Sequence, residues 1–95
     1  MQTLTIESSG NTHFLIRQAV ERETARLELS LELAQKRLQP FKQKYGVSSR
    51  YFIQEMTAED LDGGDQEYVH WAGEYRLMER LATKLAQLQE IRFFD

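Results

Sequence analysis

The chain has 95 residues, of which 41% are hydrophobic and 28% charged, as expected for one folded domain with a small core. It has no cysteine, which excludes disulfides, thiolate zinc sites and cysteine nucleophiles and agrees with a reducing cytoplasm, where we expect the protein to reside. No apolar run approaches the roughly 20 residues that span a bilayer, and the amino terminus lacks the apolar segment of a signal peptide. We therefore expect no membrane association.

The net charge of −3 is divided unevenly along the sequence. Residues 1–45 contain seven Lys and Arg against five Asp and Glu, whereas residues 46–95 contain five against ten. Binding to a phosphate backbone depends on cationic contacts, so the acidic half disfavours nucleic acid as a partner.

Residues 1–8 predict a strand-like arm. Gln2 to Glu7 alternates polar and apolar residues, with β-branched side chains, which is typical of a short half-buried strand. A strand before helices also suits a ribbon–helix–helix protein, so a DNA-binding autoregulator that uses this strand is one alternative function. That class needs two short helices, whereas one long segment follows here.

Residues 11–45 predict one long helix, with Asn11 or Thr12 as its N-cap. Pro40 removes a backbone donor and crowds the preceding turn, so we expect a kink near residues 36–40 or a helix end there. The apolar residues in the second part of the segment are spaced alternately four and three apart, which is coiled-coil spacing. They are Leu27, Leu31, Ala34, Leu38, Phe41 and Tyr45.

Residues 27–33 are ambiguous because leucines alternate with Glu and Ser, a period of two that also suits a strand. The Leu, Glu and Ala content of the segment and its flanks favours helix. We call the coiled-coil-spaced residues from Leu27 to Tyr45 the inward stripe. In a helix, Leu29 and Leu33 lie roughly opposite it and form a second stripe, which Leu15 and Ala19 extend. A single hairpin covers only one of these faces, so the second predicts contact with another chain.

Residues 46–65 predict one or two short helices joined by an acidic turn. Gly46 follows a basic turn and is expected at the C′ position of the long helix. Ser48 or Ser49 is expected to cap a short helix whose Phe52 faces inward, and Thr57 to begin another with an acidic first turn.

Residues 55–67 contain six acidic residues and no basic one. Asp60, Asp62 and Asp65 are candidate ligands for a divalent cation, but an EF-hand loop counted from Asp60 fails at its fifth, sixth and twelfth positions. We interpret the acidic residues as helix caps and dipole partners, with Asp65 capping the last helix. The sequence thus predicts no metal and no cofactor.

Residues 66–90 predict the second long helix, followed by a strand-like tail at 91–95. One stripe of this helix has steps of three and four residues. It consists of Tyr68, Trp71, Tyr75, Met78, Ala82 and Leu85, and we expect it to pack on the inward stripe of the first helix. A glycine inside a helix costs up to about 1 kcal/mol relative to alanine, so Gly73 predicts a crossing element near Ala72 and Gly73.

His70 and Glu74 are four residues apart, a spacing that two metal ligands on a helix can have. The other histidine, His13, is far away in sequence and no third ligand is evident, so a surface contact is the favoured interpretation. No nucleophile elbow, phosphate-binding loop or catalytic set occurs, and we expect no enzymatic activity.

Two short segments resemble a known group of proteins. Lys44–Ser49, with a Tyr-Gly-x-Ser-Ser pattern, and Glu67–Tyr75, with Glu-Tyr-x-x-Trp-Ala-Gly-Glu-Tyr, are similar to small prokaryotic helical proteins of toxin–antitoxin-type gene pairs. His70 departs from that pattern, which has an acidic residue there. The resemblance covers residues 27–91 and implies an antitoxin-like protein that binds a small partner encoded beside it. An acidic antitoxin would suit a basic toxin.

The sequence predicts a single all-α domain: a long antiparallel, coiled-coil-like helical hairpin with short connecting helices and short strand-like termini. The expected function is non-enzymatic binding of a cognate toxin-like protein, or of a second copy as a structural homodimer. The candidate partner-binding residues are Leu29, Leu33, Leu77, Leu81 and Leu88.

Overall fold

A computed structural model describes residues 5–7 and 10–94 of the chain, with side chains described for residues 12–91. Most of these residues lie in helices, which confirms the helical class. The elements in chain order are β1 (Thr5–Glu7), α1 (Gly10–Tyr45), α2 (Ser49–Glu55), the 3-10 helix η1 (Ala58–Asp60), α3 (Gly64–Gln89) and β2 (Arg92–Phe94).

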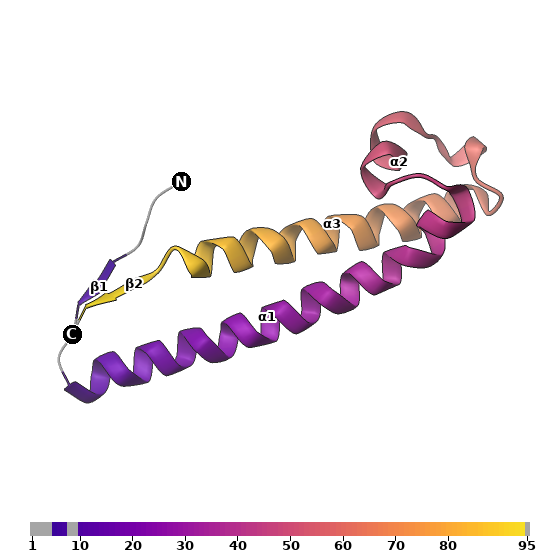
Figure 1. Cartoon of the computed structure of the whole chain (residues 1–95). Helices are drawn as coiled ribbons and strands as arrows, with labels where there is room; N and C mark the ends of the chain where they lie inside the picture. Colours follow the sequence, from indigo (N-terminus) through magenta and orange to yellow (C-terminus); the bar gives the residue numbers. More distant parts are fainter. Residues whose placement is uncertain (1–4, 8–9, 95) are drawn as a thin grey trace.

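The two long helices lie side by side and determine the shape of the molecule, which measures 58 × 23 × 19 Å (Figure 1). α1 runs toward the end where α2 and η1 lie, and α3 leads back alongside it (Figure 1). None of the described helices has an apolar stretch that could cross a membrane.

β1 and β2 form a two-stranded parallel sheet at the end of the molecule away from α2 (Figure 1). Thr5 is opposite Arg92, and Glu7 is opposite Phe94. The sheet and α2 therefore lie at opposite ends of the two long helices (Figure 1).

α1 is one uninterrupted helix of 36 residues. The helical interpretation of residues 27–33 is confirmed, as is the continuation of the long helix to Tyr45. Of the two alternatives for Pro40, the helix end is wrong, and the kink near residues 36–40 stays a prediction. Pro40 is exposed, so water can solvate the backbone carbonyl that its missing N–H leaves without a partner. The helix also begins before the expected caps, because Gly10 is already helical.

The connections between the helices follow the local sequence closely. Gly46 has a φ of +67° and its N–H donates to the Lys42 carbonyl at 2.8 Å, as expected for a C′ glycine. The Ser48 hydroxyl accepts a hydrogen bond from the Tyr51 N–H, which makes Ser48 the N-cap of α2. Thr57 and Asp60 form a capping box at η1, which confirms the expected start there.

The expected cap of the last helix is wrong by two residues. α3 begins at Gly64 with Gly63 as its N-cap, so Asp65 lies inside the first turn. No side chain caps the start of α3 in the way expected of Asp65, but the N–H of Gly63 itself donates to Glu67 Oε1 at 3.0 Å.

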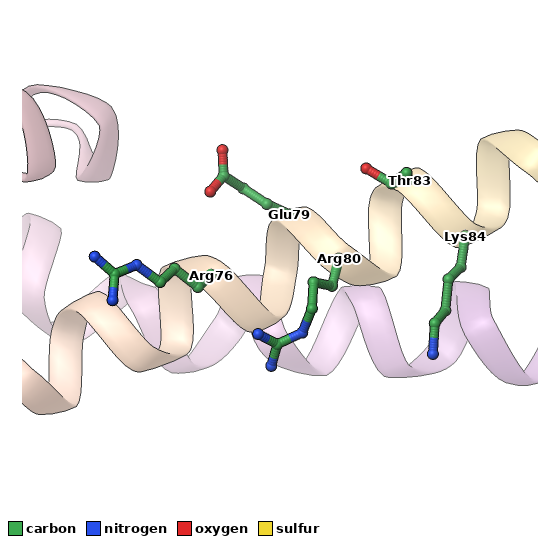
Figure 2. Close-up of a pocket in the computed structure, with 5 residues that line it drawn as sticks. All are labelled: Arg76, Glu79, Arg80, Thr83 and Lys84. Carbon is green, nitrogen blue, oxygen red and sulfur yellow. The ribbon is translucent and has the colours of Figure 1, made fainter. Parts of the chain in front are cut away.

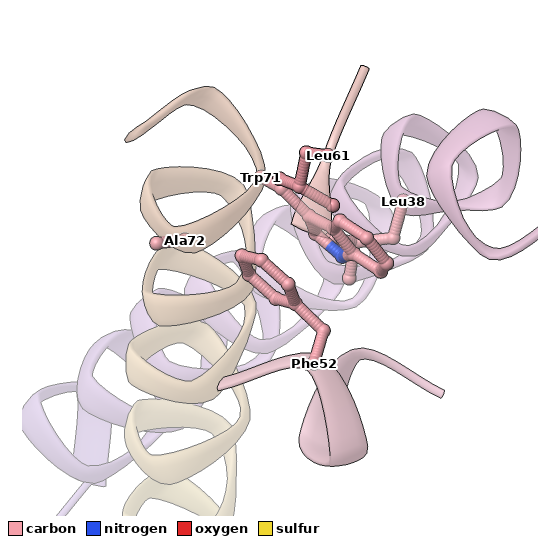
Figure 3. Packing of buried hydrophobic residues seen from close by; sticks show 5 residues of the cluster. All are labelled: Leu38, Phe52, Leu61, Trp71 and Ala72. Atoms are coloured by element: carbon pink, nitrogen blue, oxygen red, sulfur yellow. The ribbon is translucent and has the colours of Figure 1, made fainter. Parts of the chain in front are cut away.

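The largest part of the core lies where α2 crosses the two long helices (Figure 3). The Trp71 and Phe52 side chains are fully buried and stack with ring centroids 3.9 Å apart and planes 1° from parallel. Phe41 stacks on Trp71 at 5.3 Å, and the Trp71 Nε1–H donates to the Ser49 hydroxyl at 2.9 Å. Of the stripe predicted to face the first helix, Trp71 is fully buried, and Tyr68, Tyr75 and Met78 pack partly buried against this core.

Gly73 does not have the expected role. It is exposed, and a Cβ built on it would meet nothing within 4 Å outside its own helix backbone. The prediction of a crossing element at Gly73 is wrong, although its neighbour Ala72 is buried in the core.

Candidate partner-binding surface

A row of exposed residues runs along α1 at alternating steps of four and three. We call it the outer stripe; it consists of Leu15, Ala19, Arg22, Arg26, Leu29 and Leu33, all of which are exposed. The Leu15, Leu29 and Leu33 side chains are 60%, 57% and 45% exposed. Exposed leucines at helical spacing mark a candidate interaction surface, so the outer stripe, whose two ends are apolar, is the first candidate for a binding surface.

The carboxyl-terminal part of the outer stripe borders α3. Arg37 Nε donates to Glu74 Oε2 at 2.7 Å and joins the two helices on one side of the molecule. Leu33 is one helical turn before Arg37, and Leu77 is one turn after Glu74, so both lie on that side. The sequence-predicted Leu33 and Leu77 thus belong to the same surface.

The remaining predicted residues of α3 continue this surface but are less exposed than expected. Leu81 and Leu88 follow Leu77 at heptad-like spacing, and all three are half-buried at the edge of the α1–α3 contact. We call Leu33, Leu77, Leu81 and Leu88 the leucine edge. Near its far end an open depression of about 390 Å³ is lined by Leu88, Ile91 and Leu27 together with charged side chains.

Two of the charged residues that line that depression, Glu23 and Arg26, form an ion pair with each other. Arg26 Nε donates to Glu23 Oε1 at 2.9 Å. This hydrogen bond, aided by the charge of Lys84, holds the pKa of the Glu23 carboxyl below its usual value. The apolar residues of the depression are therefore surrounded by charged side chains of both helices, Glu23 and Arg26 on α1 and Lys84 on α3.

Sequence reasoning did not single out a row of cations on α3. Arg76, Arg80 and Lys84 follow one another at steps of four and, with Glu79 and Thr83, line a shallow depression of about 540 Å³ (Figure 2). In the part of the chain with described side chains, Arg76 and Arg80 make no ion pair. The spacing of four was the available signal, but such rows are usually solvated helix faces.

The motif residues of the connecting region form a polar cluster instead of a binding site. The Tyr45 hydroxyl donates to Glu67 Oε1 and accepts the Asp62 N–H at 2.9 Å, while Lys44 Nζ donates to Glu67 Oε2 at 2.9 Å. With the Gly63 N–H these donors lower the pKa of Glu67 to about 2, the Tyr45 hydrogen bond contributing most. The cluster fixes the start of α3 against the end of α1.

The acidic residues do not assemble a cation site among the described side chains, where no group of three or more His, Asp or Glu lies in a ligating arrangement. His70 Nε2 lies 4.0 Å from Glu74 Oε1, and the His70 ring packs edge-on against Phe41 at 5.1 Å. The surface-contact interpretation of this pair agrees with that geometry.

Neither a protein-family model, nor a curated protein, nor a solved structure matches the chain.

Proposed function

We propose that the chain is a non-enzymatic protein-binding module, antitoxin-like in kind, that neutralises a small partner protein by burying an apolar segment of it. The binding surface is the outer stripe together with the leucine edge. The observation that carries the proposal is the exposure of Leu29 and Leu33, 57% and 45%, in the middle of a 36-residue helix.

The architecture of the proposed module is an antiparallel, coiled-coil-like hairpin of α1 and α3, with β1 and β2 at its open end. Residues 1–4, 8 and 95 of the predicted strand-like termini lie outside the described residues. The support is the interhelical contact network: Arg37 to Glu74, Lys44 to Glu67, and the stacked rings around Trp71. A partner helix lying along the leucine edge would add a third helix where the hairpin has only two.

The resemblance to toxin–antitoxin-type proteins supports the kind of partner. The residues that carry the resemblance, among them Gly46, Ser48 and Trp71, build the connecting region and its core. In this proposal they hold the helices together, and the leucines that the packed helices leave exposed form the recognition surface. We also propose a cytoplasmic location, with which the absence of cysteine agrees.

Co-expression with the product of the adjacent gene tests the proposal. We expect the two proteins to co-purify, and Leu29→Glu or Leu33→Glu to abolish the complex, because either places a carboxylate in an apolar contact. Val69→Glu is the matched control: Val69 is 69% exposed on another face of α3, and its substitution should leave the complex intact.

Two results would contradict the proposal. A protein that sediments as a monomer and forms no complex with the adjacent gene product is not a binding module of this kind. A complex that survives both leucine substitutions but is lost in Val69→Glu would move the binding surface to the face of α3 that carries Val69.

A further inference from the structure

A depression of about 350 Å³ lies where the start of α2 meets the two long helices (Figure 1). Its lining comes from α1, from the segment 48–50 at the start of α2, and from α3. This volume is at the small end of the roughly 300–1,000 Å³ found for small-molecule sites. None of its lining residues belongs to the outer stripe or the leucine edge. The depression is thus a candidate site separate from the proposed protein-binding surface.

The charged residues that line this depression are both cations. They are Lys42 on α1 and Arg50 on α2, and none of the lining residues is acidic. Among the described side chains neither cation has an ion-pair partner, whereas Lys44, in the same last turn of α1, pairs with Glu67 at 2.9 Å. Lys42 is also half-buried, and a partly desolvated ammonium group without a counter-ion loses hydration that nothing replaces. An anion in the depression would supply the missing counter-charge.

Two serine hydroxyls at the start of α2 add hydrogen-bond donors. The Ser48 oxygen accepts the Tyr51 N–H at 3.1 Å. The Ser49 oxygen accepts the Trp71 Nε1–H at 2.9 Å. A hydroxyl that accepts a hydrogen bond keeps its own O–H to donate. Both serines line the depression, and Ser49 is only 5% exposed, so packing holds its hydroxyl in place. Cations and O–H donors together, with no carboxylate beside them, favour a phosphate group.

The rest of the lining suits the organic part of a ligand. Leu38 and Met78 provide apolar surface from the two long helices, and Tyr75 adds an aromatic ring. Leu38 belongs to the buried core, on which Tyr75 and Met78 pack, so this side of the depression is firmly supported. A ligand that joins a phosphate to a small apolar group therefore matches the depression better than inorganic phosphate does.

We propose that this depression binds a small phosphate monoester. The phosphate lies between Lys42 and Arg50, where the guanidinium group can bind two of its oxygens at once. It accepts further hydrogen bonds from the Ser48 and Ser49 hydroxyls, and the organic group lies on the apolar side chains of the long helices. The site uses none of the leucines of the protein-binding surface, so the inference goes beyond the proposed function and does not depend on it.

Phenyl phosphate is a suitable probe because it joins a phosphate monoester to one small ring. Titrated into the full chain in a phosphate-free buffer, it should give saturable one-to-one binding by isothermal titration calorimetry. Phenol and inorganic phosphate should each bind at least about tenfold more weakly, because each lacks one half of the probe. The fluorescence of Trp71, the single tryptophan, should change in the same titration, since its ring donates to the Ser49 hydroxyl.

Two substitutions and a matched control locate the binding. Lys42→Ala and Arg50→Ala should each weaken phenyl phosphate binding about tenfold or more, because each removes a charge-assisted contact. Neither side chain belongs to the hydrophobic core, and far-UV circular dichroism checks that both variants fold. Arg80→Ala removes one exposed cation of α3 that does not line the depression, and it should leave the affinity unchanged.

Each outcome decides the inference. Saturable binding that both alanine variants weaken and Arg80→Ala does not is the expected result. No binding of phenyl phosphate at millimolar concentration overturns the proposal, as does binding that both variants leave intact. Equal weakening by Arg80→Ala means a general attraction to positive charge and overturns it too. Inorganic phosphate that binds as tightly as phenyl phosphate overturns the assignment of a monoester. None of these results affects the proposed protein complex, which Leu29→Glu tests separately.

Discussion

The two halves of the molecule use the same pair of helices in different ways. The capped end, residues 35–75, carries α2 and η1 as a third layer, whereas the two-helix half, residues 12–34 and 76–91, has no such layer. The capped end buries Trp71, Phe52 and Leu61, and the interhelical ion pairs between described side chains also lie there. The two-helix half buries Leu27 and Ala34 but leaves Leu29 exposed.

The difference shows what a third layer does for a pair of long helices. Two helices cover each other along one stripe only, so further apolar residues stay exposed unless another element covers them. At the capped end the chain supplies that element itself. In the two-helix half the proposed partner supplies it, which is why we expect stability to reside in one half and binding in the other.

The largest effect should come from the centre of the capped end. Trp71→Ala removes the ring stacked between Phe52 and Phe41 and leaves the Ser49 hydroxyl without its donor. The free energy of unfolding should fall by about 3–5 kcal/mol, measured by chemical denaturation with far-UV circular dichroism. Val69→Ala, on an exposed face of the same helix, should change it by no more than about 0.5 kcal/mol. Equal losses in both variants would contradict the comparison.

Gly63→Ala should destabilise the start of α3. A Cβ at Gly63 would lie 2.7 Å from Glu67 Cβ, close to the backbone and unable to swing away, so the first turn must shift. Overpacking of this kind costs about 1–3 kcal/mol. The shift would also displace the carboxylate that Tyr45 and Lys44 bind. A melting temperature unchanged from wild type would show that the turn adapts freely.

The same cluster should make the capped end sensitive to acid. The pKa of Glu67 is depressed from 4.5 to about 2, first by the Tyr45 hydrogen bond and then by Lys44. A carboxylate with a depressed pKa stabilises the fold fully above its unfolded pKa, and this stabilisation is lost as the pH falls through the folded value. The melting temperature should therefore decline between pH 4.5 and about 2.

Glu67→Gln is the matched variant for this acid sensitivity. It keeps the shape of the side chain but removes the titrating group, so its melting temperature should depend less on pH in that window. A wild-type and a Glu67→Gln profile that run parallel would contradict the assignment to Glu67.

The features that could be predicted from sequence are those set by neighbouring residues. The inward stripe, the C′ glycine at Gly46 and the Ser48 cap depend on spacing and on local hydrogen bonds, and the structure has them all. The leucine positions of the candidate surface also follow from spacing. Their exposure does not: Leu29, on α1, is exposed, whereas Leu81, on α3, is half-buried.

The features that could not be predicted depend on contacts across the fold. Gly63 caps α3 because the Glu67 side chain folds back over it, and that position is fixed by Tyr45 from another helix. The position of the Glu67 side chain cannot be read from composition or periodicity alone.

Gly73→Ala is the smallest of these changes and has the opposite sign to Gly63→Ala. Gly73 lies inside α3 in an exposed position, with open space where a Cβ would be and no positive φ. Alanine there should raise the free energy of unfolding by about 0.5–1 kcal/mol, because it restricts the unfolded chain and favours helix. The same exchange thus destabilises where a carboxylate side chain crosses the glycine and stabilises where nothing does. A loss of stability in Gly73→Ala, measured in the same denaturation experiment, would mean that another element approaches this face after all.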